Sequence, residues 1–244
     1  MDSGRRAESA GCLRQPGREG VAGQRCLYGR CCAGCAQSGR DYSAGGARYN
    51  PHGVPLTGLA VYVDSLMAIK RLCFDEGVIA LPELLEAVRS NWRDRELLRR
   101  RAMESAHLGD GRGEAAALAA RLLDELTGFV GEFRNERGGK FQCGLYSYVD
   151  IVEWAKLTRA TPDGRHDGDF LSQGLTPSRL HRDDVTSLLR DLGSLPLEKF
   201  PANSVLTLSL SRNGLDSTRF AAFLEAWLAL KASGMLQLNC VKIG

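Results

Sequence analysis

Residues 31–50 of the chain read CCAGCAQSGRDYSAGGARYN, which places three cysteines directly before a glycine-rich turn. Glycine adopts backbone conformations that other residues avoid, so such a turn can hold a neighbouring thiol in a fixed place. An apolar, helix-forming segment follows the turn. We therefore expect this stretch to carry a functional cysteine, with the rest of the chain organised around it.

The composition is that of an ordinary globular protein. The chain has 244 residues, of which 43% are hydrophobic and 25% are charged, and these values are typical of soluble domains. No run of about 18 apolar residues is present, so we expect neither a transmembrane helix nor a membrane partner. Residues 1–20 contain arginines but no apolar segment, which argues against a secretory signal. A cytoplasmic location is expected.

Basic charge is concentrated at the start of the chain. Residues 1–40 hold seven arginines and three acids, whereas the remainder has 25 basic and 26 acidic residues. The arginines are scattered and lack interleaved aromatic residues, so we expect no nucleic acid partner. Residues 1–38 show neither the helical nor the strand period. We therefore expect a disordered or mistranslated head at 1–38 and a folded part at 39–244.

Five of the eight cysteines lie within the first 40 residues. A disulfide scaffold is not expected in a chain of this length without a secretory signal. Cys32 and Cys35 form a C-x-x-C pair, but no second pair of ligands follows at the spacing of a zinc site, so we expect no metal. Cys73, Cys143 and Cys240 are expected to be small buried hydrophobes.

Hydrophobic periodicity predicts helices in the first half of the folded part. One helix should begin with Asp64 as its cap and end at Gly77, and another should have Pro82 in its first turn. A solvated helix is expected at 93–105, followed by a glycine-rich break. A long amphipathic helix over 114–137 should bury Ala117, Leu118, Leu122, Leu126, Phe129, Val130 and Phe133.

The second half alternates between strands and helices. Strands are expected at 140–152, 203–211 and 235–241, and helices at 185–192 and 218–232. The segment 160–165 has a Pro-Asp-Gly centre and predicts a turn, and 171–180 predicts a loop. Long helices between well-separated strands favour an α/β fold.

Six segments occur in the order and spacing of one enzyme family. They are GRDY at 39–42, GARYN at 46–50, DSLMAIK at 64–70, GGKF at 138–141, TPDGR at 161–165 followed by Gly168, and LQLNCV at 236–241. Together they resemble the catalytic domain of the glycyl radical enzymes, which include pyruvate formate-lyase and the glycerol and diol dehydratases. The resemblance implies part of the family's α/β barrel, about half of a ten-stranded barrel ringed by helices.

The resemblance also implies a radical chemistry. In the family a glycyl radical, installed by a separate S-adenosylmethionine iron–sulfur activating enzyme, abstracts hydrogen from a cysteine. The resulting thiyl radical then abstracts hydrogen from the substrate. The expected activity is therefore radical C–C lysis of the formate acetyltransferase type, or diol or glycerol dehydration. The expected partners are the activating enzyme and a second copy or an intact relative.

The resemblance offers three candidates for the radical cysteine. Counting seven residues back from the glycine of GRDY selects Cys32, and Cys31 then makes an adjacent pair as in pyruvate formate-lyase. That pair favours acyl-type C–C cleavage. Diol dehydratases instead have Gly-Cys followed two residues later by a catalytic Glu, which Gly34, Cys35 and Gln37 resemble with Gln in place of Glu. Our order is Cys32, then Cys31, then Cys35, and the substrate-binding residues stay unknown.

Other polar residues of these segments have structural interpretations. Asp163 and Arg165 are expected to fix a turn rather than to touch substrate, and Arg48 and Asn50 to brace the loop through hydrogen bonds.

The family's radical glycine lies in an Arg-Val-x-Gly-Tyr segment, which the 244 residues do not contain. We therefore expect a truncated glycyl radical enzyme that binds no cofactor and carries no glycyl radical of its own. The alternative is an inactive remnant, or an interaction module that pairs with an intact relative.

Overall fold

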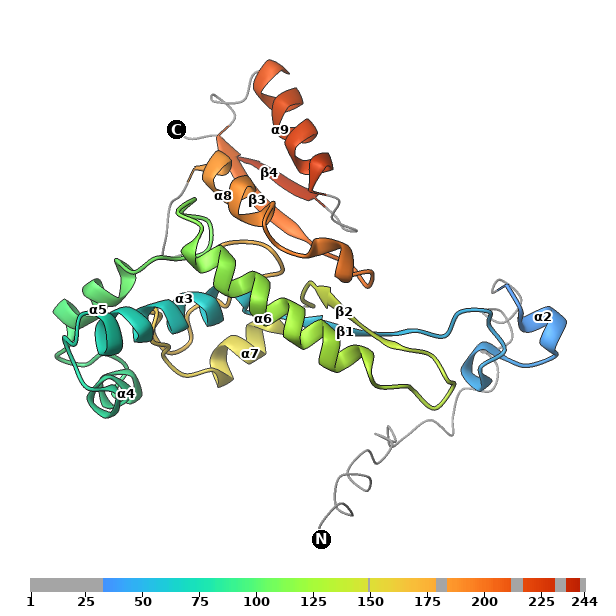
Figure 1. The fold of residues 1–244 in the computed structure, drawn as a ribbon, viewed down its shortest axis with the longest axis horizontal. Helices are drawn as coiled ribbons and strands as arrows, with labels where there is room; N and C mark the ends of the chain where they lie inside the picture. Colours follow the sequence, from blue (N-terminus) through green and yellow to red (C-terminus); the bar gives the residue numbers. More distant parts are fainter. Residues whose placement is uncertain (1–32, 149, 179–183, 212–216, 231–235, 242–244) are drawn as a thin grey trace, which may run out of the picture. The chain divides into compact units, whose positions relative to one another are not determined.

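The computed structural model describes residues 33–148, 150–178, 184–211, 217–230 and 236–241 (Figure 1). The chain divides into two compact units. The first comprises residues up to Gly53 together with Phe129–Gln142, and the second comprises Val54–Gly128 and Cys143–Gly244. Cys31, Cys32 and most of the expected head at 1–38 lie outside the described residues.

The first unit consists of short elements joined by glycine turns. Helix α2 (Cys35–Ser38) is followed by the 3₁₀ turn η1 (Tyr42–Ala44). Strands β1 (His52–Leu56) and β2 (Phe141–Leu145) begin in this unit and pair in a two-stranded sheet. The rings of His52 and Phe141 lie 5.1 Å apart between centroids.

The second unit begins with three helical segments around an apolar core. Helix α3 (Leu59–Ile69) runs on into the π-helical segment η2 (Lys70–Asp75), and α4 (Leu81–Arg89) and α5 (Glu96–Met103) follow. Pro82 lies in the first turn of α4, as predicted. The core cluster is formed by Ala68, Leu72, Leu84, Ala87, Val88, Trp92, Ala102 and Ala160.

The expected start of the first helix at Asp64 is wrong. Helix α3 begins five residues earlier, at Leu59, because Gly58 caps it with a left-handed φ of 82° and the residues Leu59–Val61 are buried. Asp64 lies inside the helix and is buried, and its Oδ1 accepts a hydrogen bond of 2.8 Å from the backbone N–H of Leu108. The carboxylate therefore holds the glycine-rich break after α5 instead of capping its own helix.

The long helix α6 (Glu114–Gly131) also differs from the prediction. It ends at Gly131 rather than 137, and Gly128 and Gly131 near its end explain this because glycine is a poor helix former. Its buried residues are Ala115, Ala116, Ala119 and Leu123. Of the predicted apolar face, Leu126, Phe129 and Phe133 are 36%, 60% and 41% exposed. Small alanines thus make the packing face, because they allow close approach of neighbouring backbone.

The strand-like run at 140–152 splits into two elements. Strand β2 ends at Leu145, and helix α7 (Ile151–Leu157) takes up the last residues. Ile151 and Ala155, which are four residues apart and share one helix face, are its buried residues.

The end of the chain forms a parallel β-α-β unit. Helix α8 (Val185–Leu192) and the 3₁₀ turn η3 (Leu197–Lys199) precede β3 (Leu206–Ser211). Helix α9 (Ser217–Ala229) connects β3 to β4 (Leu236–Val241), and the two strands pair in parallel from Leu206 with Leu236 to Ser211 with Val241 (Figure 1). Leu145 at the end of β2 forms a parallel bridge with Ser204. The fold is therefore mixed α/β, as predicted.

Within the described parts of the chain, no helix has both the length and the apolar character needed to cross a membrane.

Candidate active site

Cys35 is the first residue of α2 and is only 5% exposed. The helix begins after Gly34, whose φ of 101° is left-handed. The side-chain oxygen of Gln37 accepts a hydrogen bond of 2.9 Å from the backbone N–H of Gly34. Ser38 donates from its hydroxyl to the carbonyl oxygens of Cys35, at 3.3 Å, and Gly46, at 3.1 Å. The thiol is therefore buried in a loop whose two ends are bonded to each other.

Two glycines allow this loop to close. The backbone N–H of Arg48 donates to the carbonyl of Ala33 at 2.7 Å. A Cβ added to Gly34 would lie 2.7 Å from the Arg48 nitrogen, and one added to Gly46 would lie 1.9 Å from the Arg40 carbonyl oxygen. Both distances are shorter than real Cβ contacts, so the approach of these backbone segments requires glycine.

Asp41 organises the centre of the loop. Its Oδ1 accepts hydrogen bonds from the backbone N–H of Ser43 at 2.8 Å and from the Ser43 hydroxyl at 2.6 Å. Its carbonyl accepts from the N–H groups of Ala44 and Gly46 at 3.0 and 2.9 Å. The guanidinium of Arg40 donates to the carbonyl of Ala44. This segment is therefore a self-bonded turn, and Asp41 is one of the residues that hold it.

A second segment, the 133–141 hairpin, meets the loop from far along the chain. Asn135 donates from its side-chain nitrogen to the carbonyl of Asn50 at 2.7 Å, and its oxygen accepts from the N–H groups of Arg137 and Gly139 at 3.0 and 2.8 Å. The guanidinium carbon of Arg137 lies 5.2 Å from the centre of the Tyr42 ring. The segments GRDY, GARYN and GGKF are thus brought together in one unit.

The braces predicted from the sequence are confirmed in part. Asn50 donates from its side-chain nitrogen to the carbonyl of Ala47 at 2.6 Å, as expected of a loop brace. Arg48 braces the loop through its backbone N–H, whereas its guanidinium lies 5.5 Å from the centre of the Tyr49 ring. Sequence reasoning missed Asn135 and Arg137. The Asn-x-x-Gly-Gly pattern at 135–139 is typical of a turn and was the available clue.

The TPDGR segment forms a turn, and its two charged residues fix that turn as predicted. Arg165 is 1% exposed and donates to the carbonyls of Thr158 and Asp169 at 2.8 and 2.6 Å, and also to that of Arg159. Asp163, also 1% exposed, accepts a hydrogen bond of 2.5 Å from the Thr161 hydroxyl. Burial raises the pKa of the Asp163 carboxyl and lowers the pKa of the Arg165 guanidinium. The hydrogen bonds of Asp163 and Arg165 hold the turn in shape.

The later cysteines lack the surroundings of a reactive thiolate. Cys143 is 2% exposed and Cys73 is half-buried, and burial raises the pKa of both thiols. The prediction of a buried small hydrophobe is confirmed for Cys143, whereas the side chain of Cys240 lies outside the described residues. In the part of the chain that the structure describes, no group of three or more His, Cys, Asp or Glu side chains could hold a metal ion.

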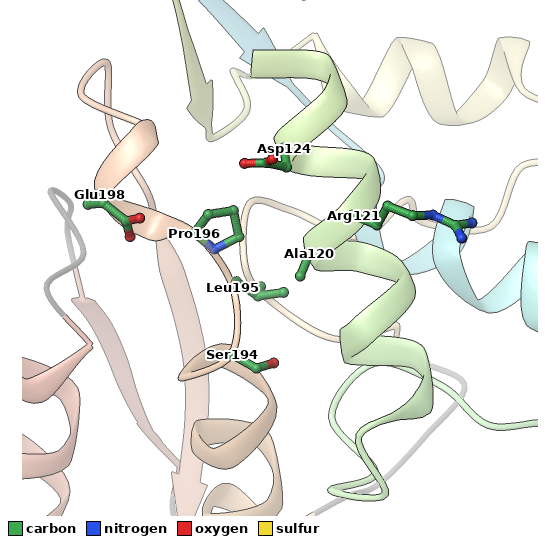
Figure 2. Close-up of a pocket in the computed structure, with 7 residues that line it drawn as sticks. All are labelled: Ala120, Arg121, Asp124, Ser194, Leu195, Pro196 and Glu198. Carbon is green, nitrogen blue, oxygen red and sulfur yellow. The ribbon is translucent and has the colours of Figure 1, made fainter. Parts of the chain in front are cut away.

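A shallow pocket of about 450 Å³ lies in the second unit, between α6 and the segment after α8. Figure 2 shows Asp124 turned toward that segment and Arg121 turned away from it. Asp124 forms an ion pair with Lys199. None of the described residues that line the pocket is a cysteine. The residues that line the pocket are Ala120, Arg121, Asp124, Ser194, Leu195, Pro196 and Glu198.

Comparisons with known proteins support the family resemblance. The sequence profile of the pyruvate formate lyase-like family matches residues 27–154. The match includes Cys31, Cys32 and Cys35 as well as the first four segments. The chain therefore belongs to the pyruvate formate lyase-like family of glycyl radical enzymes.

Two dehydratases and one further glycyl radical enzyme are among the proteins that this chain is similar to. The (2S)-3-sulfopropanediol dehydratase of Klebsiella oxytoca is 33% identical over 145 residues, which are 59% of this chain and 18% of the relative. A glycyl radical enzyme from Archaeoglobus fulgidus superposes with a TM-score of 0.80 at 31% identity over 88% of this chain. The B12-independent glycerol dehydratase of Clostridium butyricum gives a TM-score of 0.80 at 26% identity over 85% of this chain.

The chain corresponds to only a part of these enzymes. It spans 28% of the Archaeoglobus protein and 27% of the glycerol dehydratase.

Proposed function

We propose that this chain provides the thiol loop of a glycyl radical dehydratase, and that Cys35 is the thiol that becomes a radical. The observation that carries the proposal is the burial of Cys35 in a loop built from segments shared with the family. A buried thiyl radical is shielded from solvent and from oxygen. Cys32 and Cys31 are the alternative thiols. Substitution of each of the three cysteines in turn shows which one turnover requires.

The proposed chemistry begins and ends at the Cys35 sulfur. A glycyl radical takes the hydrogen atom of the S–H bond, and the thiyl radical then takes a hydrogen atom from a substrate C–H bond, re-forming S–H. The substrate radical loses hydroxide from the neighbouring carbon and a proton from its own hydroxyl, which together make water. The product radical takes back the sulfur-bound hydrogen. A loop that fixes the thiol supports near-attack geometry for both transfers.

Dehydratase chemistry is preferred over acyl C–C cleavage for two reasons. Two of the relatives above are dehydratases by name, acting on sulfopropanediol and glycerol. In addition, Gly34-Cys35-Ala36-Gln37 resembles the Gly-Cys segment of the diol dehydratases, whereas the acyl cleavage prediction rested on the Cys31–Cys32 pair.

Gln37 makes the proposed site unusual. The resemblance implies a carboxylate two residues after the thiol, which would take up and return the proton in dehydration. An amide cannot do so, and the Gln37 oxygen is already bonded to the N–H of Gly34. We expect slow dehydration that Gln37→Glu accelerates by about 100-fold, since general acid–base catalysis contributes on the order of 10² or more. Unchanged turnover in Gln37→Glu would contradict this role.

The radical glycine would come from a polypeptide segment outside these 244 residues. The proposed assembly is the family barrel, to which this chain contributes the cysteine loop and the β-α-β unit. The proposed partners are the activating enzyme, which installs the radical, and a second copy or an intact relative. On this proposal the chain, purified alone and treated with the activating enzyme, gives no glycyl radical doublet in electron paramagnetic resonance, and a clear doublet would overturn it.

Complementation tests the whole proposal. Glycerol dehydratase lacking the 27% of its chain that this protein matches is co-expressed anaerobically with this protein and the activating enzyme. We expect a radical doublet and turnover of glycerol, (2S)-3-sulfopropanediol or a related diol. Cys35→Ser should lower that turnover by at least about 10³-fold, as removal of an essential catalytic side chain does, while Cys31→Ser and Cys32→Ser should retain it.

Two results would overturn the proposal. If Cys32→Ser or Cys31→Ser lost turnover while Cys35→Ser stayed active, the radical would be assigned to Cys31 or Cys32. A stable complex that shows the doublet but turns over none of these diols would favour the interaction module.

A further inference from the structure

We infer that Asn135 is a positioning residue for the Cys35 thiol, an inference that rests on the proposed role of Cys35. Asn135 is 8% exposed and lies in the 133–141 hairpin. Its side-chain oxygen accepts from two N–H groups of its own hairpin, and its side-chain nitrogen donates to the carbonyl of Asn50 at 2.7 Å. One amide therefore holds the hairpin and the loop at the same time.

A series of hydrogen bonds leads from Asn135 to Ala33, which lies two residues before Cys35. Asn50, whose carbonyl Asn135 binds, donates from its own side chain to the carbonyl of Ala47 at 2.6 Å. The next backbone group along, the N–H of Arg48, donates to the carbonyl of Ala33 at 2.7 Å. Ala33 and Gly34 lead directly into Cys35. Displacement of Asn50 would thus be passed through two hydrogen bonds to the residues that enter α2.

Neighbouring backbone leaves Asn50 little freedom to find another partner. A Cβ on Gly139 would lie 1.6 Å from the Asn50 carbonyl oxygen, so the hairpin backbone packs directly against that group. The carbonyl is therefore screened from solvent on that side. Without the Asn135 amide it would lose its bonded partner, and a polar group in such a place gains by moving toward water.

Only a side chain with both a donor and an acceptor performs both tasks. Asp at position 135 would still accept from Arg137 and Gly139, and so preserve the hairpin turn, but it has no hydrogen to donate to Asn50. Asn135→Asp therefore removes the link to the loop and keeps the turn, whereas Asn135→Ala removes both. This difference separates positioning from simple loss of the hairpin.

Thiol accessibility in the full chain is the test. The chain is treated with iodoacetamide under native conditions, and the alkylation of each cysteine is followed by peptide mass spectrometry. Cys143, which is 2% exposed, serves as the reference within the same molecule. We expect the ratio of the Cys35 rate to the Cys143 rate to rise about fivefold to tenfold in Asn135→Asp, the effect of losing about one hydrogen bond.

The matched control is Glu136→Gln, an exposed neighbour in the same hairpin whose ratio should stay at the wild-type value. An unchanged ratio in Asn135→Asp would overturn the inference. A parallel rise at Cys35 and Cys143 would also overturn it, because it would indicate general opening of the fold.

The labelling experiment needs no radical, so it stands or fails separately from the proposed function. In the complemented enzyme Asn135→Asp should lower kcat for the diol while KM changes less than twofold, because the thiol is displaced and the substrate contacts are kept. If complementation fails while the labelling ratio rises, the positioning of Cys35 holds and the radical role is lost.

Discussion

Two glycine-containing loops of the molecule are held by a polar side chain that bonds to backbone carbonyl groups. In the 158–169 turn, Arg165 binds carbonyls that lie within seven positions of itself. In the 33–50 loop, the carbonyl of Asn50 is bound by Asn135, which lies 85 positions away. The donor that holds the 158–169 turn belongs to the turn itself, so we call it the self-closed turn, although Arg99 and Asn91 also bond to its backbone. The 33–50 loop, whose ends Ala33 and Arg48 bond to each other, is held in addition by a distant hairpin.

The comparison separates two kinds of loop stability. The main bonds of the self-closed turn come from its own buried residues, Arg165 and Asp163. A loop closed at long range responds to changes in a distant segment. On the proposal above Cys35 carries the radical and needs accurate placement, and the inferred link through Asn135 would make that placement depend on the 133–141 hairpin.

The largest effect is expected in the self-closed turn. Arg165→Met leaves the carbonyls of Thr158, Arg159 and Asp169 without their donor, and should lower the free energy of unfolding by about 3 kcal/mol or more, because unpaired buried polar groups each cost about 1–3 kcal/mol. Urea denaturation measures the change. Arg159→Met, the same substitution at an exposed side chain, should cost less than about 0.5 kcal/mol. Equal losses in the two variants would show that Arg165 does not hold the turn.

Glycine substitutions in the thiol loop come next. Gly34→Ala combines a φ of 101° with a Cβ position 2.7 Å from the Arg48 nitrogen, and should cost about 2–3 kcal/mol. Gly39→Ala, with a φ of 60° and no neighbour within 4 Å of the added Cβ, should cost about 1 kcal/mol. Thermal unfolding measures both, and native alkylation should show faster labelling of Cys35 in Gly34→Ala only. The close approach at Gly34 would be refuted by similar costs at the two positions.

The sequence predicted local features and missed the long-range ones. The TPDGR turn follows from a Pro-Asp-Gly centre, and the prediction that Asp163 and Arg165 fix this turn is confirmed, whereas their burial was not predicted. The glycine pattern at 45–46 likewise indicated a tight loop. Nothing in the loop itself points to Asn135, because a partner 85 residues away is chosen by packing and not by local propensity.

The errors in the helices have the same cause. Large apolar residues at helical spacing predicted the buried face of α6, but alanines pack there and Phe129 is 60% exposed. Asp64 looked like a helix cap, and it is a buried acceptor for Leu108, 44 positions along the chain.

A smaller effect is expected where an arginine stacks on a tyrosine in the thiol loop. Arg137 lies over Tyr42, which is half-buried, and Tyr42→Leu should cost about 0.5–1 kcal/mol through loss of the cation–π contact. Tyr49→Leu is the matched control, because Arg48 lies over Tyr49 at 5.5 Å but that ring is 73% exposed, and little change is expected. Chemical denaturation measures both. If Tyr49→Leu were the more costly, the docking of the hairpin would not involve this stack.

The smallest effect concerns pH and reaches the self-closed turn through α5. Glu96 binds Arg99 through both carboxylate oxygens, at 2.8 and 2.9 Å, and Arg99 donates to the Gly164 carbonyl at 3.0 Å. The hydrogen bond from Arg99 is the main reason that the pKa of Glu96 falls from 4.5 to about 2. Because the pKa is lower in the folded state, the pair stabilises the fold above pH 4.5, and this contribution is lost as the pH falls toward about 2. We expect carboxyl resonances in NMR to give a pKa near 2 for Glu96 and a higher one in Arg99→Met, where Arg100 still bonds to Glu96, with only a slight difference in acid stability because Glu96 is exposed. A Glu96 pKa that stays near 2 in Arg99→Met would show that Arg100, and not Arg99, lowers it. The titration of Glu96 would then have no link to the Gly164 carbonyl.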